Sequence, residues 1–316
     1  MKKILLVDSV HELLPKLLEE TGFTCIPAWD LEIEDIIRMT YENIEGIIIR
    51  SRFKLDQQII EKFGDIKFIA RFGSGMENID VQCATQRGIK CINAPEGNCN
   101  AVAEHAIGML IALMRNINTG DHQLRNGEWI REGNRGHEIE GKTVAIIGFG
   151  RTGSSFAEKL NSFNCKVIAY DPYTNVDSKK YPYVEQTEMS TIFSGADIIS
   201  IHVPLTAETT KMVNAEYLKS FQKKLWLINT SRGKVIDTED LVDAMKNDKV
   251  QGVALDVLEY ESHSFENIQE PEMPYPLKFL INNNNVILTP HIAGWTHESN
   301  EKLSRIVAER ILKIYE

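Results

Sequence analysis

Three polar side chains late in the chain each follow an apolar run that suggests a β-strand. Arg232 ends Leu-Ile-Asn-Thr-Ser-Arg, Glu261 comes shortly after Ala-Leu-Asp-Val-Leu, and His291 ends Val-Ile-Leu-Thr-Pro-His. An arginine can hold a carboxylate through two parallel hydrogen bonds, and a histidine can transfer a proton near neutral pH. A carboxylate can orient that histidine and stabilise its charged form. Because ligands bind at strand ends in α/β sheets, we expect the three side chains to converge there.

A glycine-rich turn upstream predicts a dinucleotide site. Gly148-Phe-Gly150-Arg-Thr-Gly153 follows a strand-like apolar run and opens a helix-like stretch. Such glycines permit a tight turn, a close approach of the backbone to a pyrophosphate, and close helix packing. Asp171 ends the next apolar run, where a carboxylate would bind the ribose and repel the extra phosphate of NADP. The cofactor is therefore predicted to be NAD, and the chemistry hydride transfer on a 2-hydroxy or 2-oxo acid.

Strand-like runs alternate with helix-length segments along the whole chain, which predicts doubly wound α/β architecture. Their near-continuous Ile, Val and Leu content is typical of parallel strands that are covered on both faces. The expected strands are residues 3–7, 46–49, 68–72, 90–93, 143–147, 167–170, 198–202, 225–229 and 252–256. Residues 100–125 are predicted to form one long helix between the two groups of strands, and residues 296–315 a final helix that returns to the first domain. Residues 260–285 form a long polar connection, which either borders the active site or is a surface excursion.

Composition narrows the class of protein. The chain has 316 residues, of which 43% are hydrophobic and 25% charged, as in ordinary globular proteins of two domains. A net charge of −10 argues against nucleic-acid and anionic-membrane partners. The short apolar run near the amino end is predicted to be a strand and not a signal peptide. The five cysteines lack Cys-x-x-Cys or metal-ligand spacing, so reduced thiols, a cytoplasmic location and no metal are expected.

With these motifs placed, the chain resembles the D-isomer-specific 2-hydroxyacid dehydrogenases over nearly its whole length. The matching stretches are residues 50–52, 73–80, 93–95, 100–104, 148–153, 202–205, 229–233, 254–256 and 289–291. The resemblance implies two doubly wound parallel-sheet domains, with a Rossmann-type cofactor domain inserted in a split flavodoxin-like substrate domain. We expect residues 1–98 and 288–316 to form the substrate-binding domain and residues 99–287 the NAD-binding domain.

The resemblance also implies roles for individual residues. Arg232 would bind the substrate carboxylate and carbonyl oxygen, His291 would be the acid/base, and Glu261 its partner. The glycine turn and Asp171 would bind the cofactor. His202, Val203 and Pro204 would form the wall of the adenosine site. Thr230 would be a further cofactor contact, and Asp256 would hold the nicotinamide carboxamide. The full predicted cofactor set is Gly148, Phe149, Gly150, Arg151, Thr152, Gly153, Asp171, His202, Val203, Pro204, Thr230 and Asp256. The predicted substrate set is Arg50, Ser51, Ser74, Gly75 and Arg131, the last reaching the active site of a neighbouring subunit in a homodimer.

The substrate itself stays open. The chain is most similar to D-3-phosphoglycerate dehydrogenase-like members of the family, and no regulatory domain is expected after its last helix. Phosphoglycerate oxidation, a step of serine biosynthesis, is the first choice because Arg50, Arg52 and Arg131 could meet a phosphate. Reduction of hydroxypyruvate or glyoxylate is the alternative, since Trp295 is bulkier than usual and could narrow the pocket. Formate or phosphite oxidation fits Glu261 less well, and an NAD-sensing corepressor scaffold is a further alternative.

Overall fold

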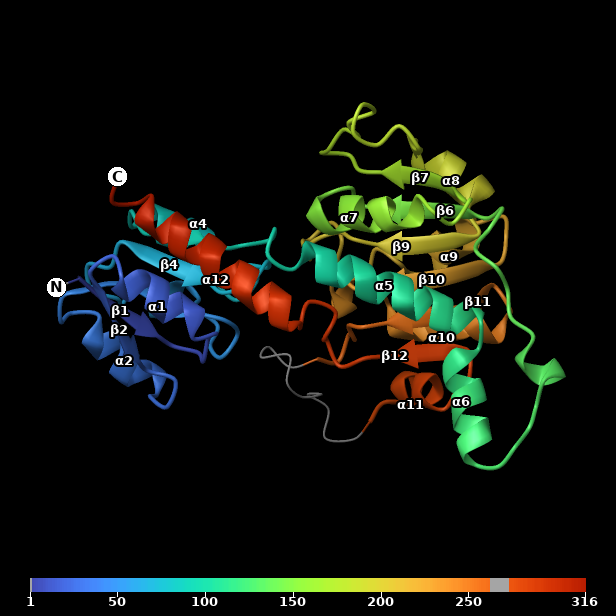
Figure 1. Ribbon diagram of the computed structural model, residues 1–316, viewed down its shortest axis with the longest axis horizontal. Helices are drawn as coiled ribbons and strands as arrows, with labels where there is room; N and C mark the ends of the chain where they lie inside the picture. Colours follow the sequence, from blue (N-terminus) through green and yellow to red (C-terminus); the bar gives the residue numbers. More distant parts are fainter. Residues whose placement is uncertain (1, 262–272) are drawn as a thin grey trace. The chain divides into compact units, whose positions relative to one another are not determined.

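The computed structural model describes residues 2–261 and 273–316, which fold into two compact units. One unit contains residues 2–99 and 294–316, and the other contains residues 100–261 and 273–293 (Figure 1). The second boundary therefore lies after Ala293 and not before residue 288. The reason is that the stretch up to Ala293 is tied by hydrogen bonds to Asp256 in the second unit. In the described part of the chain, no helix combines the length and apolarity that crossing a bilayer requires.

The first unit is a five-stranded parallel sheet in the order β2-β1-β3-β4-β5, the flavodoxin-like order. Its strands are β1 (Lys2–Leu6), β2 (Phe23–Pro27), β3 (Ile44–Ile49), β4 (Phe68–Arg71) and β5 (Lys90–Ile92). Its helices are α1 (Leu13–Glu19), α2 (Ile33–Met39), α3 (Gln57–Ile60), α4 (Val81–Gln86) and α12 (His297–Leu312). Alternate residues of β3 point to opposite faces: Ile47 and Ile49 pack with α2, α3 and α4, whereas Ile48 packs with α1 and α12.

The second unit holds a seven-stranded parallel sheet in the order β12-β11-β10-β9-β6-β7-β8. Its strands are β6 (Thr143–Ile147), β7 (Lys166–Tyr170), β8 (Val184–Gln186), β9 (Ile198–Ile201), β10 (Leu225–Asn229), β11 (Val250–Leu255) and β12 (Val286–Leu288). The chain starts at β6, runs outward to β8, and then returns to build the other half from β9. All the strands are parallel, but the direction in which successive strands are added to the sheet reverses between β6 and β9. Rossmann-type sheets bind dinucleotides at this switch point.

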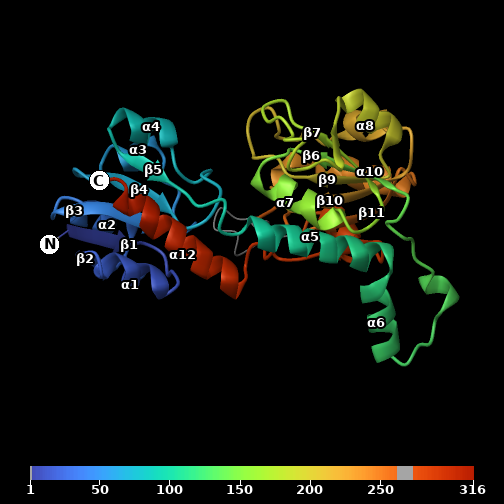
Figure 2. The same ribbon diagram turned by 45° about the horizontal axis from the view of Figure 1, so that its top comes forward.

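Helices cover both faces of this sheet (Figures 1 and 2). They are α5 (Cys99–Met114), α6 (Ile117–Arg125), α7 (Arg151–Leu160), α8 (Met189–Gly195), α9 (Ala215–Ser220), α10 (Thr238–Lys246) and α11 (Tyr275–Ile281), with short 3₁₀ turns η1 (Glu132–Asn134) and η2 (Gly233–Val235). Helices α5 and α7 pack on the face that contains Val144 and Ile146, and α8, α9 and α10 pack on the face that contains Ala145 and Ile147. The predicted doubly wound architecture with two parallel sheets is confirmed.

Some local expectations were wrong. The single helix over residues 100–125 is two helices, because Asn116 adopts a left-handed conformation (φ 54°) that breaks the hydrogen-bond ladder between α5 and α6. Strands β2 and β8 lie at the edges of their sheets, where polar residues interrupt the apolar pattern, and were not predicted. Part of the long polar connection forms helix α11, which begins at Tyr275 with a proline in its first turn. The final helix is confirmed, with Leu303, Val307 and Ile311 buried.

Candidate active site

Parallel strands place the predicted acid/base, carboxylate-binding and cofactor residues of the second unit at one edge of its sheet. Strands β10, β11 and β12 are neighbours, and their carboxyl ends lead into Arg232, Asp256 and His291. Strands β6, β7 and β9 lead into the glycine turn, Asp171 and His202 at the same edge. Neighbouring strands lie only about 4.8 Å apart, so the sheet gathers side chains that are remote in sequence.

The structure brings Glu261 and His291 into direct contact. Nδ1 of His291 lies 2.8 Å from Oε2 of Glu261, and both side chains are largely buried, at 23% and 16% exposure. The other carboxylate oxygen, Oε1, accepts a hydrogen bond from the backbone N–H of Leu258 at 2.5 Å, which fixes the carboxylate plane. The pair therefore has the geometry of an oriented imidazole that can carry a proton.

Asp256 holds the turn that presents His291. Its carboxylate is 1% exposed and accepts hydrogen bonds from the Thr289 hydroxyl (2.6 Å) and from the backbone N–H groups of Ile292 (2.8 Å) and Ala293 (2.9 Å). Within this turn His291 has φ 55°, an uncommon conformation for a residue with a side chain. The resemblance assigns Asp256 to the cofactor carboxamide. The contacts observed here show that its carboxylate also holds the turn that contains His291.

Arg232 sits on a loop that buried neighbours fix. Asn229, which is fully buried, donates from Nδ2 to the Arg232 carbonyl (2.9 Å) and accepts from the Ser231 N–H and hydroxyl through Oδ1. The guanidinium donates to the Ser231 carbonyl at 2.7 Å. A Cβ on Gly233 would lie 1.9 Å from the Leu258 carbonyl oxygen, so only glycine lets this loop pack against the segment that leads to Glu261.

The glycine turn has the features that a pyrophosphate site requires. Gly148 has φ 91°, and a Cβ on Gly153 would lie 2.1 Å from the Gly148 carbonyl oxygen. Helix α7 begins at Arg151, directly after Gly150, and the amino end of a helix is where backbone N–H groups can bind an anion. Asp171 accepts a hydrogen bond from the Phe149 N–H at 2.7 Å through Oδ2, and therefore ties the turn to the end of β7.

The segment after β9 borders this turn, and Thr230 follows the next strand of the sheet, β10. Val203 lies beside Gly148, since its Cγ1 is 3.0 Å from the position a Cβ would take. His202 is buried, packs against the Phe156 ring at a tilt of 39° and shares a 2.8 Å hydrogen bond with Ser200. Burial lowers the pKa of His202 to about 3, so its ring is neutral near pH 7 and does not serve as an acid. The Thr230 hydroxyl is buried without a hydrogen-bond partner among the described residues, as fits a group that awaits a ligand.

The predicted substrate residues other than Arg131 belong to the first unit, at the carboxyl edge of its sheet. Arg50 and Ser51 follow β3, and Ser74 and Gly75 follow β4. The Arg50 backbone N–H donates to Asp8 Oδ2 at 2.6 Å. This hydrogen bond joins the ends of β1 and β3, the two parallel strands between which the strand order of the sheet reverses. The Ser74 hydroxyl donates to Asn98 at 2.5 Å, and its carbonyl accepts from Asn93 at 2.6 Å.

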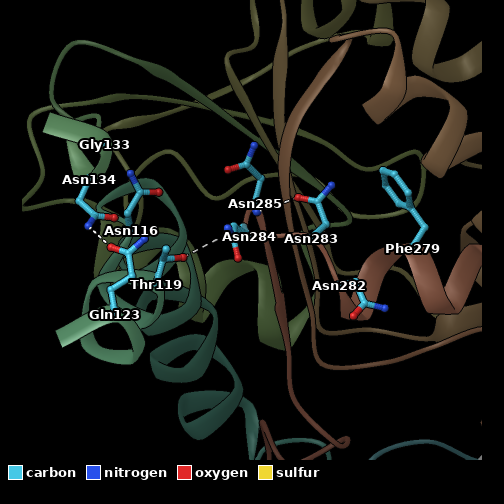
Figure 3. A pocket seen from close by; sticks show the side chains of 10 residues that line it. All are labelled: Asn116, Thr119, Gln123, Gly133, Asn134, Phe279, Asn282, Asn283, Asn284 and Asn285. Carbon is cyan, nitrogen blue, oxygen red and sulfur yellow. Dashed lines mark hydrogen bonds between the residues drawn. The ribbon is translucent and has the colours of Figure 1, made fainter. Parts of the chain in front are cut away.

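Arg131 lies on an exposed segment of the second unit, immediately before the 3₁₀ turn η1. The same segment contributes to a cavity of ≈ 520 Å³ (Figure 3). Its walls are mostly amide side chains: Asn116, Thr119, Gln123, Gly133, Asn134, Phe279, Asn282, Asn283, Asn284 and Asn285. Because Asn285 precedes β12, this cavity lies at the amino ends of the strands, away from His291 at the carboxyl ends. Residues 282–285 of the long polar connection thus lie away from His291, and residues 262–272 of that connection lie outside the described part of the chain.

Two residues with positioning roles were missed by the sequence reasoning. Asn229 and Thr289 carry hydrogen bonds that fix the loops of Arg232 and His291. A polar residue at the end of an otherwise apolar run was the available signal in both cases. Thr289 Oγ1 also lies 3.0 Å from Nε2 of His105, which the sequence analysis left without a role. In residues 2–261 and 273–316, no group of three His, Cys, Asp or Glu side chains could hold a metal ion.

Comparisons with known proteins agree with this architecture. Residues 107–293 match the model of the D-isomer specific 2-hydroxyacid dehydrogenase NAD binding domain. A D-3-phosphoglycerate dehydrogenase of Archaeoglobus fulgidus is 33% identical over 312 residues, which are 99% of this chain but 57% of that protein. The chain thus spans about half the length of the phosphoglycerate dehydrogenases that it matches. A glyoxylate reductase of Thermofilum pendens is 35% identical, with 90% of this chain and 82% of that protein covered.

A solved structure gives the same result for the fold. A glyoxylate reductase from Paecilomyes thermophila superposes with a TM-score of 0.87 at 25% identity, covering 100% of this chain and 95% of that one. The cofactor of this chain is NAD, as its matched domain indicates. From its glycine turn, its two parallel sheets and these matches, the chain belongs to the D-isomer-specific 2-hydroxyacid dehydrogenases, a family of oxidoreductases.

Proposed function

We propose that this protein transfers a hydride between NAD and C2 of a small D-2-hydroxy or 2-oxo acid. The observation that carries the proposal is the 2.8 Å His291–Glu261 pair, at the same sheet edge as the glycine turn. NAD, when bound, supplies or accepts the hydride. Residues 148–153, Asp171 and Thr230 would hold it, and the buried Thr230 hydroxyl supports that fit.

Arg232, His291 and Glu261 would then bind the substrate and transfer the proton. In the reduction direction Arg232 holds the substrate carboxylate in a two-pronged grip, which orients the carbonyl. With Nδ1 of His291 bonded to Glu261, Nε2 is assigned the proton transfer to the C2 oxygen. Glu261 stabilises the imidazolium that donates this proton in reduction and forms again in oxidation.

Our first choice of substrate is 3-phosphoglycerate and its 2-oxo product, in serine biosynthesis. Arg50 and Arg131 support it as two arginines that could contact a phosphate, and relatives with that activity match 99% of this chain. The second candidate is reduction of hydroxypyruvate or glyoxylate. It is favoured by the glyoxylate reductase of Thermofilum pendens, of which the chain covers 82%.

We propose further that the protein is a cytoplasmic homodimer. Helix α6 and the segment after it project from the body of the second unit in both views (Figures 1 and 2). This arm exposes large apolar side chains: Ile117 (51%), Leu124 (56%), Trp129 (78%) and Ile130 (44%). An exposed apolar group of this kind supports a protein interface. Five free cysteines support a reducing compartment.

The test is an NADH oxidation assay with 3-phosphohydroxypyruvate, hydroxypyruvate, glyoxylate and pyruvate. We expect turnover with at least one of them, a loss of about 10²–10⁴-fold in kcat in His291→Ala, and a loss of about 10- to 200-fold in kcat/KM in Arg232→Ala. His297→Ala, at an exposed helix start, is the matched control and should keep wild-type rates. A wild type that binds NADH tightly but reduces none of the acids, and that captures a specific protein, would favour the corepressor scaffold instead.

A further inference from the structure

In the first unit Arg50, a predicted substrate residue, contacts Trp295, and the proposed function gives this contact no role. The guanidinium carbon of Arg50 lies 4.2 Å from the centre of the Trp295 ring, within cation–π distance. Trp295 is 55% exposed, so it is not a core residue. Both belong to the same compact unit although 245 positions separate them in the sequence. The contact is therefore made by the fold and is invisible in the sequence.

The backbone is fixed on both sides of this pair. The Arg50 N–H donates to Asp8 at 2.6 Å, and its carbonyl accepts from Asn78 Nδ2 at 3.1 Å. Trp295 directly precedes a capping box, in which the Thr296 side chain accepts from the Ser299 N–H and the Ser299 hydroxyl from the Thr296 N–H. Both partners therefore meet without ordering a loose segment, which lowers the entropic cost of the contact.

Hydrogen bonds and packing link this pair to the loop of Ser74 and Gly75. Asn78, four residues after Ser74, holds the carbonyl of Arg50. On the other side, Ser74 bonds to Asn98, whose side chain packs within 2.7 Å of the position a Cβ on Gly294 would take. Gly294 precedes Trp295. The pair thus borders the segment that contains Ser74 and Gly75, two of the predicted substrate residues.

Stacking and anion binding use different parts of a guanidinium. The indole covers the face of the ion, whereas the N–H donors lie in its plane and can bind a carboxylate or phosphate at the same time. We propose that Trp295 is a positioning residue for Arg50, and that the pair selects substrates with a second anionic group beyond the reacting 2-oxo acid. This inference rests on the proposed function.

The experiment compares kcat/KM for 3-phosphohydroxypyruvate, 2-oxoglutarate and hydroxypyruvate with NADH. In wild type we expect 3-phosphohydroxypyruvate and 2-oxoglutarate, which both have a second anionic group, to be preferred over hydroxypyruvate. If the second anionic group must be a phosphate, only 3-phosphohydroxypyruvate will be preferred. Trp295→Leu should lower that preference by about 2- to 30-fold, the range for exposed to desolvated cation–π pairs, and Trp295→Phe should restore part of it. Trp29→Leu, at another partly exposed tryptophan of the same unit, should leave it unchanged.

A double-mutant cycle separates positioning from simple bulk. If Trp295 acts through Arg50, Trp295→Leu has no further effect on the preference in an Arg50→Ala background. Equal effects of Trp295→Leu in both backgrounds would overturn the inference, and so would a wild type that turns over hydroxypyruvate without preferring either acid that has a second anionic group. In the latter case the proposed dehydrogenase function stands. A wild type inactive on every 2-oxo acid refutes the proposed function and this inference together.

Discussion

His202 should make the second unit less stable as the pH falls through 6. The ring is 7% exposed, and burial lowers its pKa from 6.5 to about 3. A histidine that must stay neutral when folded but can take up a proton when unfolded favours the unfolded state in acid. Its stability contribution is therefore complete above about pH 6.5 and declines as the pH falls toward 3.

The magnitude follows from linkage. At pH 5 the unfolded histidine is mostly protonated and the folded one is not, which costs about 2 kcal/mol of unfolding free energy relative to pH 7. His202→Gln removes the titrating group. The variant will be less stable at every pH because the ring packs against Phe156. However, its loss between pH 7 and pH 5 should be smaller than that of wild type by about 2 kcal/mol.

The measurement is urea unfolding at pH 7, 6 and 5, followed by tryptophan fluorescence. Trp226 is a suitable reporter, because it is buried in β10, the strand that pairs with β9. Carboxylates that titrate near pH 5 affect both proteins alike and cancel in the comparison. His297→Gln, at an exposed histidine, should keep the wild-type pH dependence. If wild type and His202→Gln lose the same free energy from pH 7 to pH 5, the ring is not held neutral and the reasoning fails.

Three further predictions concern loops of the site. Asp256→Asn should lower the free energy of unfolding by about 2–4 kcal/mol, since a buried N–H of the His291 turn loses its charged acceptor. The free energy from equilibrium unfolding and kcat should both fall, and unchanged values would show that Asp256 does not hold the turn. Gly233→Ala should lower kcat/KM and the melting temperature because the new Cβ meets the Leu258 carbonyl, whereas Gly195→Ala, where a Cβ meets nothing within 4 Å, should be silent. Asp171→Ala should weaken NADH binding and reduce discrimination against NADPH in titrations; equal use of both cofactors by wild type would contradict this.

The burial of long apolar runs was readable from the sequence alone. Central strands such as β6 and β10 match their expected bounds because continuous Ile, Val and Leu can only be satisfied inside a covered sheet. Strand–helix alternation then fixes a parallel, doubly wound fold. The glycine turn was likewise predictable, because the chemistry of a pyrophosphate site demands local residue types. The edge strands β2 and β8 were not, since their neighbours in space decide their pairing.

Only the tertiary structure decided which side chains touch. The spacing of Glu261 and His291 says nothing about a 2.8 Å contact; parallel pairing of β11 with β12 creates it. The same holds for Asp256, whose contacts arise from the turn after the next strand, and for Arg50 and Trp295, which meet because α12 packs on the first sheet. Sequence patterns encode local conformation and burial, whereas a contact between distant residues depends on the register of whole elements, which no local pattern contains.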